Sequence, residues 1–452
     1  MNKRTFLKLA SAMLASPILS PLLTWASDKL KNWAGNIEYS TQNLHSSNSL
    51  DDIRQFVKEE GHLKVLGTRH CFNTIADSKY TFLSLNPLSE RPMEEIVALD
   101  PQARTVTIPA GTKYGQFAPY LHQKGFALHN LASLPHISVA GACSTATHGS
   151  GEKNGNLSTA VSALELVTAA GDLIRISRKE DPETFPGAVV GLGALGVITR
   201  VTLNVQPTYL MRQYVYENLP FSQMKDHFDA IQAAAYSVSL FTDWQNQLFS
   251  EVWLKSRTEP GQAFDPTPEF FGAKAATKNL HPIAALSAKN CTEQLGVPGP
   301  WYDRLPHFRM GFTPSAGKEL QSEFFVPRRH AVEALLAIER LRDQITPHLM
   351  ISEIRAIAAD DLWMSTCYQR PSVTIHFTWK PDWPNVSKLL PVIEKELAPF
   401  QAKPHWGKLF TMPPSHLQSL YPQLPDFVQL VKHYDPQGKF RNQFLNTNIF
   451  SA

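Results

Sequence analysis

A run of small residues between Asn130 and Gly151 constrains the fold of this chain more than any other feature. The segment reads NLASLPHISVAGACSTATHGSG. Its small members near the end are Gly141, Ala142, Ser144, Thr145, Ala146, Thr147, Gly149, Ser150 and Gly151. Small side chains let backbone N–H groups and hydroxyls approach a ligand closely, which suits the wrapping of a pyrophosphate or a flat ring system. The segment therefore predicts a nucleotide-binding loop.

A second glycine turn lies in the stretch LGTRHCFNTIADS, from Leu66 to Ser78. Gly67 comes three residues before His70, so the backbone can approach a ligand closely here as well. Two such loops in a domain without a Rossmann pattern indicate a flavin nucleotide. The local sequence leaves open whether His70 is a hydrogen-bonded core histidine or is joined to the ligand.

The stretch GLGALG (191–196) matches the pattern GxGxxG but stands in the wrong context. A Rossmann fingerprint follows a strand and opens a helix whose N-terminus meets the pyrophosphate. Here the glycines run directly into VITRVTLNV, a β-branched stretch that predicts a strand. We therefore reject a Rossmann site and expect these glycines to mark close backbone approach.

The residue pattern changes near Pro207, which predicts two domains in an α+β chain of 452 residues. We place an FAD-type domain at 37–207, a substrate (cap) domain at 208–414 and a C-terminal segment at 415–452 that returns to the first domain. Expected strands are 63–67, 80–85, 104–111 and 372–380, with a hairpin at 163–178 that turns at Gly171 and Asp172. Expected helices are 113–125, ended by Gly125, then 330–345, and the start of 425–442, which turns on Pro436 and Gly438.

Composition excludes several classes of function. Lys and Arg total 43 and Asp and Glu total 40, without a basic block, so we expect no nucleic-acid partner. The four cysteines, Cys71, Cys143, Cys291 and Cys367, lie far apart and form no CxxC. This spacing favours buried free cysteines over a disulfide framework or a zinc site, and we expect no metal.

The N-terminus, MNKRTFLKLASAMLASPILSPLLTWAS, predicts an export signal over 1–27. It has a short basic start (Lys3, Arg4), an apolar stretch broken by Pro17 and Pro21, and small residues near Ala26. NKRTFLK resembles a twin-arginine signal with Lys3 in place of the first arginine, and implies a periplasmic or exported protein. The alternative is an uncleaved membrane anchor; after cleavage we expect no stable membrane span.

Many blocks of this chain, in order, resemble the vanillyl-alcohol-oxidase superfamily, which has a PCMH-type FAD-binding domain. Within it they resemble alditol (xylitol) oxidases and the related sugar-1,4-lactone oxidases. The blocks are the two glycine loops already described, NWAGNIEYS (32–40), AAYSVSLFTDW (234–244), NCTEQLGVPGPW (290–301), SEIRAIAAD (352–360), HFTW (376–379), PHWGK (404–408) and DPQGKFRN (435–442). The resemblance implies a two-domain α+β flavoprotein with FAD as cofactor.

The resemblance also implies that His70 is joined covalently to the 8α-methyl of FAD. The chain departs from the broader pattern at Thr68 and Arg69, where a second glycine often precedes the histidine. Expected cofactor contacts are Gly67, Thr68, Arg69, His70, Cys71, Asn73, Tyr114, Ser133, His136, Gly141, Ser144, Thr147, Gly149, Gly196, Val197 and Ile198. For Tyr114 the helical spacing equally fits a core position. Ala132 is expected near the flavin edge, where a small residue restricts oxygen little.

Candidate substrate residues come from the second domain. Glu353 and Arg355 are two apart in a strand-like run and so share a face, as do His376 and Thr378. By themselves these charges are more typical of a solvated sheet face. The resemblance instead implies that five side chains hold a polyol against the flavin: Ser133, Glu353, Arg355, Thr378 and Lys408.

A site that hydrogen-bonds hydroxyls rejects analogues that lack them. The predicted reaction is oxidation of a terminal CH–OH of a small alditol to the aldose, with hydride transfer to flavin N5 and O2 reduced to H2O2. Glu353, Arg355, Lys408 and His376 are the catalytic candidates, and the sequence does not decide whether Lys408 or His376 is the base. The alternatives are a sugar-1,4-lactone oxidase, a polyol dehydrogenase with another electron acceptor, and a non-catalytic polyol- or flavin-binding protein.

Overall fold

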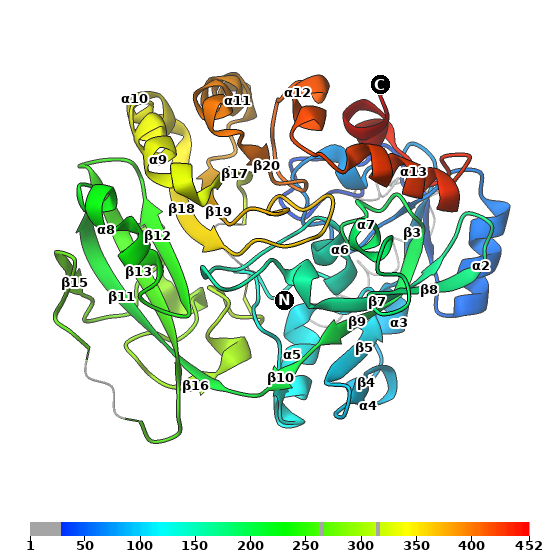
Figure 1. The fold of residues 1–452 in the computed structure, drawn as a ribbon, viewed down its shortest axis with the longest axis horizontal. Coiled ribbons are helices and arrows are strands. Elements are labelled where there is room, and N and C mark those ends of the chain that lie inside the picture. The colour runs from blue at the N-terminus through cyan, green and yellow to red at the C-terminus, as the bar shows by residue number, and fades with distance from the viewer. Residues whose placement is uncertain (1–28, 263–265, 313–316, 452) are drawn as a thin grey trace, which may run out of the picture.

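Two antiparallel sheets of different size organise the computed structural model, which describes residues 29–262, 266–312 and 317–451. In Figure 1 the larger sheet lies on the left and the smaller one on the right. Helices accompany these antiparallel sheets, which is the predicted α+β class. The predicted export signal at 1–27 lies outside the described residues. Within these residues, no helix is both long enough and apolar enough to cross a membrane.

The smaller sheet has five strands in the order β4-β5-β9-β7-β8. They are β4 (Ala98–Asp100), β5 (Thr105–Pro109), β9 (Val197–Asn204), β7 (Val161–Val167) and β8 (Leu173–Ser177). β7 and β8 form the predicted hairpin, and Gly171 in its turn has φ +81°. The stretch after GLGALG is strand β9 and not a helix, so rejection of a Rossmann site is confirmed.

A three-stranded parallel sheet adjoins it, with β1 (Leu44–Ser46), β3 (Phe82–Ser84) and β2 (Lys64–Val65) in that order. Short helices surround both sheets: α2 (Leu50–Glu59), α3 (Asn86–Ser89), α4 (Met93–Ile96), α5 (Tyr114–Gln123), α6 (Val139–Ser144) and α7 (Phe185–Val189). Helix α5 ends as predicted, since Gly125 has φ +85° and donates its N–H to His122 O.

The larger sheet follows the order β14-β15-β11-β13-β12-β18-β19-β17-β20, with β16 beside β11. Its strands are β11 (Leu210–Pro220), β12 (Ser237–Thr242), β13 (Leu248–Thr258), β14 (Glu269–Phe270), β15 (Ala273–Ala275), β16 (Gly299–Pro300), β17 (Leu320–Pro327), β18 (Leu349–Ile357), β19 (Ser372–Trp379) and β20 (Lys403–Pro404). Helices α8 (Gln223–Gln232), α9 (Ala331–Glu339), α10 (Arg342–Ile345) and α11 (Trp383–Leu397) cover one face.

Strand alternation divides β19 between two environments. Val373, Ile375, Phe377 and Trp379 pack into the apolar core beneath the helices. His376 and Thr378 therefore face the other way, toward the five-stranded sheet. Burial of the apolar face fixes the register, so the polar residues of the central strands are held on one surface.

The two parts of the chain join directly after Pro207. β10 (Gln206–Pro207) pairs with β6 (Phe126–Ala127) beside the five-stranded sheet, and β11 begins the larger sheet at Leu210. The last described part of the chain contains α12 (Pro414–Ser419), α13 (Leu424–Tyr434) and α14 (Gln443–Leu445), followed by a π-helical turn at Asn446–Phe450. The last segment packs against the first part, because Phe440 shares a core with α2 and its carbonyl accepts from Lys64 Nζ at 3.2 Å.

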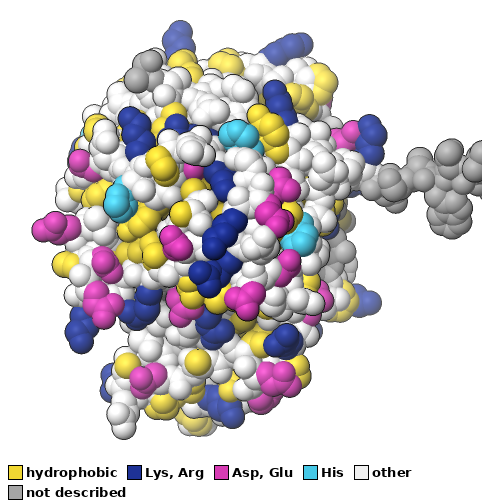
Figure 2. All heavy atoms as spheres, turned by 90° about the vertical axis from the view of Figure 1, so that its right-hand side faces the viewer, with side chains coloured by type: hydrophobic (Ala, Val, Ile, Leu, Met, Phe, Trp, Pro, Cys, Tyr) yellow, Lys and Arg dark blue, Asp and Glu magenta, His cyan; other side chains and the backbone are white. Residues whose placement is uncertain are grey.

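Figure 2 shows Lys and Arg side chains interspersed with Asp and Glu on the face that it displays. All four cysteines are free, as their spacing predicted, and three of them are buried. Cys71 is the partly exposed one, but desolvation of its thiol raises its pKa to about 11.

Candidate active site

A long cavity of about 280 Å³ lies between the two parts of the chain. One end is lined by residues of the first part, including Gly67, Ala110 and Gly193. The other end is lined by polar residues of the larger sheet, including Glu353 and Lys408. A ligand in this cavity would contact both parts of the chain at once.

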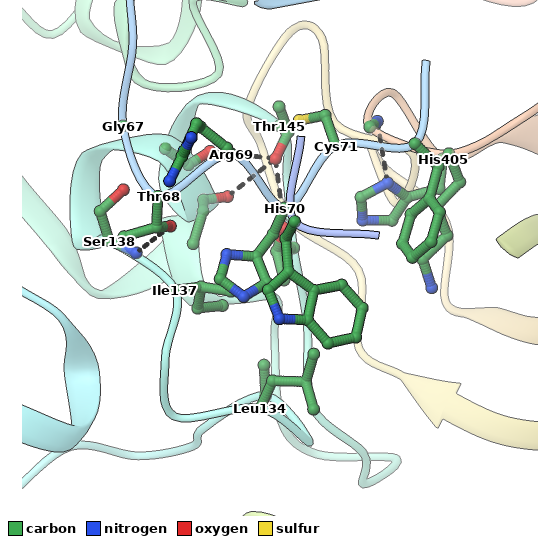
Figure 3. Close-up of a pocket in the computed structure, with 18 of the residues that line it drawn as sticks. Gly67, Thr68, Arg69, His70, Cys71, Leu134, Ile137, Ser138, Thr145 and His405 are labelled. Carbon is green, nitrogen blue, oxygen red and sulfur yellow. Dashed lines mark hydrogen bonds between the residues drawn. The ribbon is translucent and has the colours of Figure 1, made fainter. Parts of the chain in front are cut away.

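The loop after β2 presents His70 to the middle of the cavity. Figure 3 shows the His70 ring between the loop with Gly67 and Thr68 and the segment with Leu134 and Ile137. Thr68 Oγ1 accepts from Ser138 N at 3.1 Å, which ties the two glycine loops together. Gly67 lies close to the second loop, because an added Cβ would be 2.8 Å from Ser138 Oγ and this hydroxyl would have to turn away.

Arg69 takes the left-handed conformation that glycine takes most easily, with φ +63°. Its carbonyl accepts from Trp33 N at 2.8 Å, and Nη1 donates to Lys31 O at 3.1 Å. The Trp33 ring stacks on His70 with 5.3 Å between the ring centres. The N-terminal segment thus holds the loop in a conformation that the residue type disfavours.

The nitrogens of His70 are buried and have no hydrogen-bond partner among the described residues. Burial, with a contribution from His136, lowers the pKa of His70 to about 4, so its ring is neutral at pH 7. An unpaired buried imidazole is costly unless a further group meets it. A neutral ring nitrogen facing a cavity fits attachment to the flavin methyl, and these residues therefore fit FAD.

Residues of the small-residue segment form another wall of the cavity. Gly141, Ser144, Thr145 and Thr147 line it. The GLGALG segment contributes Gly193 and Gly196, with φ +64° and +156°. An added Cβ at Gly196 would lie 2.5 Å from Val167 O, so this glycine marks close backbone approach, as expected.

The register of three neighbouring strands brings one histidine and two glutamates into a row. His376 of β19 is paired with Glu353 of β18 on one side and with Glu323 of β17 on the other. All three line the cavity and are nearly inaccessible to solvent. Arg355 and Thr378 lie two residues further along these strands and so share the same face, and both line the cavity.

Glu323 is the centre of this polar surface. Its Oε1 accepts from Arg355 Nη2 at 2.6 Å, and its Oε2 accepts from Lys408 Nζ at 2.7 Å. His148 Nε2 lies 3.3 Å from Oε1. Burial by itself would raise the pKa of Glu323, but Lys408, His148 and Arg355 together hold it well below its usual range. The carboxylate is ionised and fixes the positions of both basic side chains, Arg355 and Lys408.

Lys408 and His376 form a second contact beside Glu323. Lys408 Nζ lies 2.9 Å from His376 Nδ1, and His376 Nε2 lies 3.0 Å from Thr378 Oγ1. Burial lowers the pKa of Lys408, although Glu323 opposes the shift. Burial and Lys408 lower the pKa of His376 well below its usual value. Both groups are therefore nearer to their neutral forms than exposed residues would be.

Glu353 belongs to the same surface. Its Oε1 accepts from His307 Nε2 at 2.8 Å and lies 3.5 Å from Arg355 Nε. Burial would raise the pKa of Glu353, but Arg355 and His307 lower it, so the group is ionised. Arg355 Nη1 also donates to Ser133 Oγ at 3.4 Å, which joins the sheet to the first part of the chain.

His148, Glu323 and His405 place three candidate metal ligands within 4.8 Å of one another. Both oxygens of Glu323 already accept from cationic side chains, Arg355 and Lys408. A divalent cation would have to displace these contacts against like charge, so the cluster is better described as part of the polar network.

Three predicted cofactor residues lie behind the cavity lining and hold its loops. Asn73 Nδ2 donates to two carbonyl oxygens of the loop after β20, at 2.7 and 2.8 Å. His136 Nε2 lies 2.8 Å from Met310 O. An added Cβ at Gly149 would lie 2.3 Å from Leu131 O. These three residues do not line the cavity and join chain segments around it, so their contact with the cofactor stays a prediction.

Tyr114 and Val197 are core residues and do not line the cavity. Tyr114 is 2% exposed and its hydroxyl lies 3.6 Å from Cys143 Sγ, so the core interpretation of its helical spacing is correct. Val197 lies on β9 between Gly196 and Ile198, which do line the cavity. Strand alternation turns Val197 to the opposite face, where it packs with Phe440.

The remaining predicted residues line the cavity: Gly67, Thr68, Arg69, His70, Cys71, Ser133, Gly141, Ser144, Thr147, Gly196, Ile198, Glu353, Arg355, His376, Thr378 and Lys408. Ala132 lines it as well. Sequence reasoning missed Glu323, His148, His307 and His405, all of which line the polar end. A charged residue within the apolar run LQSEFFVP was the one signal for Glu323.

Two family models match the chain: an FAD binding domain over residues 44–177 and D-arabinono-1,4-lactone oxidase over residues 314–448. The alditol oxidase of Streptomyces sp. is 44% identical over 420 residues, which cover 93% of this chain and 98% of that protein. The chain belongs to the alditol oxidase family. The resemblance seen in the sequence is thereby confirmed, and FAD is the cofactor of this family member.

More distant relatives of this alditol oxidase family member carry lactone names. The L-gulonolactone oxidase of Mus musculus is 23% identical over 92% of this chain and 97% of that protein. The L-gulono-1,4-lactone dehydrogenase of Mycobacterium tuberculosis is 25% identical over 87% of this chain and 92% of that protein. A crystal structure of cholesterol oxidase from B. sterolicum covers 96% of this chain and all of that chain, with a TM-score of 0.73 and 15% identity. At that identity the likeness concerns the fold alone.

Proposed function

We propose that this protein oxidises a terminal CH–OH of a small alditol to the aldose, with O2 as electron acceptor and H2O2 as product. One observation carries the proposal: Glu353, Arg355, Thr378 and Lys408 converge on the cavity that His70 enters. The 44% identity to an alditol oxidase supports the choice of substrate. When bound, FAD supplies a hydride acceptor at N5 and passes the electrons to oxygen.

The polar surface is suited to hold a polyol without rearrangement. Glu323 fixes Arg355 and Lys408 through bonds of 2.6 and 2.7 Å, so both side chains are in place before substrate binds. A hydroxyl can donate to Glu353 and accept from Arg355, Lys408 or Thr378. An analogue lacking that hydroxyl would leave these buried groups unpaired.

The Lys408–His376 pair is the proposed acceptor of the hydroxyl proton. The two nitrogens lie 2.9 Å apart, and burial lowers the pKa of each group. A Lys408 amine can take the proton from the hydroxyl as the hydride leaves the same carbon, and the resulting ammonium is stabilised by Glu323. His376 keeps this nitrogen in place by offering Nδ1 as an acceptor.

The direct test is peroxide release by the purified holoenzyme with xylitol, sorbitol and L-gulono-1,4-lactone as substrates. We expect turnover with the polyols and loss of at least about a hundredfold in kcat for Lys408→Met, with flavin retained. Lys380→Met, an exposed lysine on the end of the same sheet, is the matched control. Turnover with the lactone alone would contradict an alditol substrate, and no flavin bleaching by either class would indicate a binding protein.

A lactone oxidase is the second candidate, because the D-arabinono-1,4-lactone oxidase model covers residues 314–448. That range contains Glu323, Glu353, Arg355 and Lys408. The same substrate comparison distinguishes the candidates. If bleaching by a polyol is fast but oxygen reoxidises the flavin slowly, the protein is a dehydrogenase that uses another acceptor.

We also propose that FAD is attached covalently through His70. Support comes from the unpaired ring nitrogens and from the lowered pKa of His70, which keeps the ring nucleophilic. After acid precipitation we expect yellow colour in the pellet of the unmodified protein and in the supernatant of His70→Ala. Colour that washes out of the unmodified protein would contradict a covalent bond.

Export is the last part of the proposal, supported by Lys3, Arg4 and the apolar stretch that follows them. We expect the mature protein to begin near Ala26 and to be found outside the cytoplasm. N-terminal sequencing of the protein from a periplasmic fraction would test this. A full-length protein in the membrane fraction would favour the uncleaved anchor.

A further inference from the structure

Lys255 is a fully buried lysine of β13 that does not line the cavity. Its Nζ donates to the carbonyl oxygens of Leu305 and Pro306, at 2.6 and 3.0 Å, and lies 3.1 Å from His307 Nδ1. The lysine nitrogen therefore has three hydrogen-bonding contacts, two to carbonyl oxygens and one to a ring nitrogen. These three contacts hold Nζ in one fixed position.

His307 stands between Lys255 and Glu353. A neutral imidazole has one acceptor and one donor nitrogen. Burial lowers the pKa of Lys255 well below its ordinary value, although Glu353 opposes the shift. The ionised carboxylate of Glu353 can only accept, so Nδ1 of His307 accepts from Lys255 and the ring proton lies on Nε2. That nitrogen lies 2.8 Å from Glu353 Oε1 and donates to it. Burial and Lys255 lower the pKa of His307 to about 4, so the ring stays neutral.

Two aromatic side chains keep the His307 ring from turning. Trp253 and Phe241 approach it edge-on, with ring centres 5.0 and 5.6 Å away. They come from the neighbouring strands β13 and β12. The bond from His307 therefore also orients the carboxylate of Glu353. None of the hydrogen bonds among the described residues involves Oε2 of Glu353, which leaves this oxygen for a ligand.

We propose that Lys255 is a positioning residue that acts through His307 to orient Glu353 for a substrate hydroxyl. The inference rests on the proposed function for the identity of the substrate. Its structural part, the proton on His307 Nε2, rests on the contact of this nitrogen with the ionised Glu353 and does not depend on the substrate. Lys255 does not line the cavity, so it is a positioning residue and not a catalytic one.

The kinetic test uses Lys255→Met, which keeps the length of the side chain and removes the donor. In anaerobic stopped-flow reduction of the holoenzyme by xylitol, we expect kcat/KM to fall by about tenfold to a hundredfold, mostly through weaker substrate binding. Lys439→Met is the matched control. Lys439 is another buried lysine that donates to a carbonyl, that of Val57, but it lies outside the cavity. We expect it to lower thermal stability and leave kcat/KM unchanged.

A double-mutant cycle separates positioning from general packing. If Lys255 acts through His307, then Lys255→Met costs little in a His307→Gln background, because the amide can donate to Glu353 without help. Equal losses in both backgrounds would overturn the inference. An unchanged kcat/KM for Lys255→Met in an otherwise unaltered protein would also overturn it.

A spectroscopic test does not depend on the folding of Lys255→Met. In ¹⁵N NMR of histidine-labelled holoenzyme, the signals lost in His307→Gln report the tautomer of His307. We expect the proton on Nε2, and a proton on Nδ1 would overturn the inference. Should no polyol reduce the unmodified enzyme, the proposed function fails, while a proton on Nδ1 would still overturn the inference about Lys255.

Discussion

The residues at the two ends of the cavity are held in place in different ways. At the flavin end, small residues create space and the nitrogens of His70 have no hydrogen-bond partner among the described residues. At the polyol end, Glu323 bonds Arg355 and Lys408, and His376 bonds Thr378. The first end is shaped for a group that completes it, whereas the second is organised by its own charges. The side chains that hold the substrate can therefore be in place before the substrate binds.

The largest effect on the difference between the two ends is expected when the charge at the centre of the polar end is removed. Glu323→Gln leaves Arg355 and Lys408 without their shared carboxylate, and we expect the free energy of unfolding to fall by about 3–5 kcal/mol. Denaturant unfolding and xylitol turnover should both report the loss. The control is Glu319→Gln. Glu319 is a buried glutamate that precedes Glu323 in the same segment and does not line the cavity. Similar small effects of both substitutions would show that the polar end does not depend on Glu323.

Acid should loosen the polar end, because its histidines are neutral when folded. The pKa of His307 is lowered to about 4 in the folded protein, compared with an ordinary value near 6.5. Between these two pH values His307 is protonated in the unfolded chain and neutral in the folded protein. Stability is therefore present above pH 6.5 and is lost as the pH falls through 4, by about 3 kcal/mol for this residue. His148, His376 and His405 shift in the same direction, while burial of Glu251, which raises its pKa to about 7, opposes them.

Denaturant unfolding at several pH values would measure this slope. His307→Gln should flatten the curve between pH 6.5 and 4, because the amide does not titrate. A slope that is unchanged in this variant would mean that His307 does not take part in the acid response.

Removal of the cofactor should affect the flavin end and spare the polar end. In His70→Ala the flavin can be washed out, and we expect the amides of 67–72 and 141–147 to exchange hydrogen faster without FAD, by about tenfold or more. The amides of β17, β18 and β19 should exchange at the same rate with and without it. Hydrogen exchange followed by mass spectrometry measures both regions in one sample. Equal loss of protection in both regions would contradict the contrast.

The smallest expected effect concerns the backbone of the flavin end. Arg69 has φ +63°, and Arg69→Gly should relieve this conformation while losing one bond to Lys31 O. We expect the free energy of unfolding to rise by no more than about 1 kcal/mol. Arg91→Gly, at an exposed position without positive φ, should lower it by a similar amount. Thermal unfolding of the two variants would sharpen the comparison, and destabilisation by both would argue against strain at Arg69.

Local patterns in the sequence determined much of this protein. The hairpin at 163–178, the helix ended by Gly125 and the strand after GLGALG all follow from periodicity and turn residues close together in the chain. The glycine loops and the blocks shared with alditol oxidases were also enough to predict FAD, the α+β class and Glu353, Arg355 and Lys408 as a group. Periodicity alone left Tyr114 undecided, and strand alternation excluded Val197 only once the cavity side of β9 was known.

Only the tertiary structure decided how the polar end is held together. All residues of β17 and β19 are buried, so no alternation of polar and apolar exposure marks which side chains face the cavity. Strand register places Glu323 beside His376, and a loop brings His307 to Glu353 and Lys255 from about fifty residues away. Hydrogen bonds act over a few ångströms in space, and distance along the chain does not limit them. The residues that carry this network could therefore be identified only after the chain had been folded.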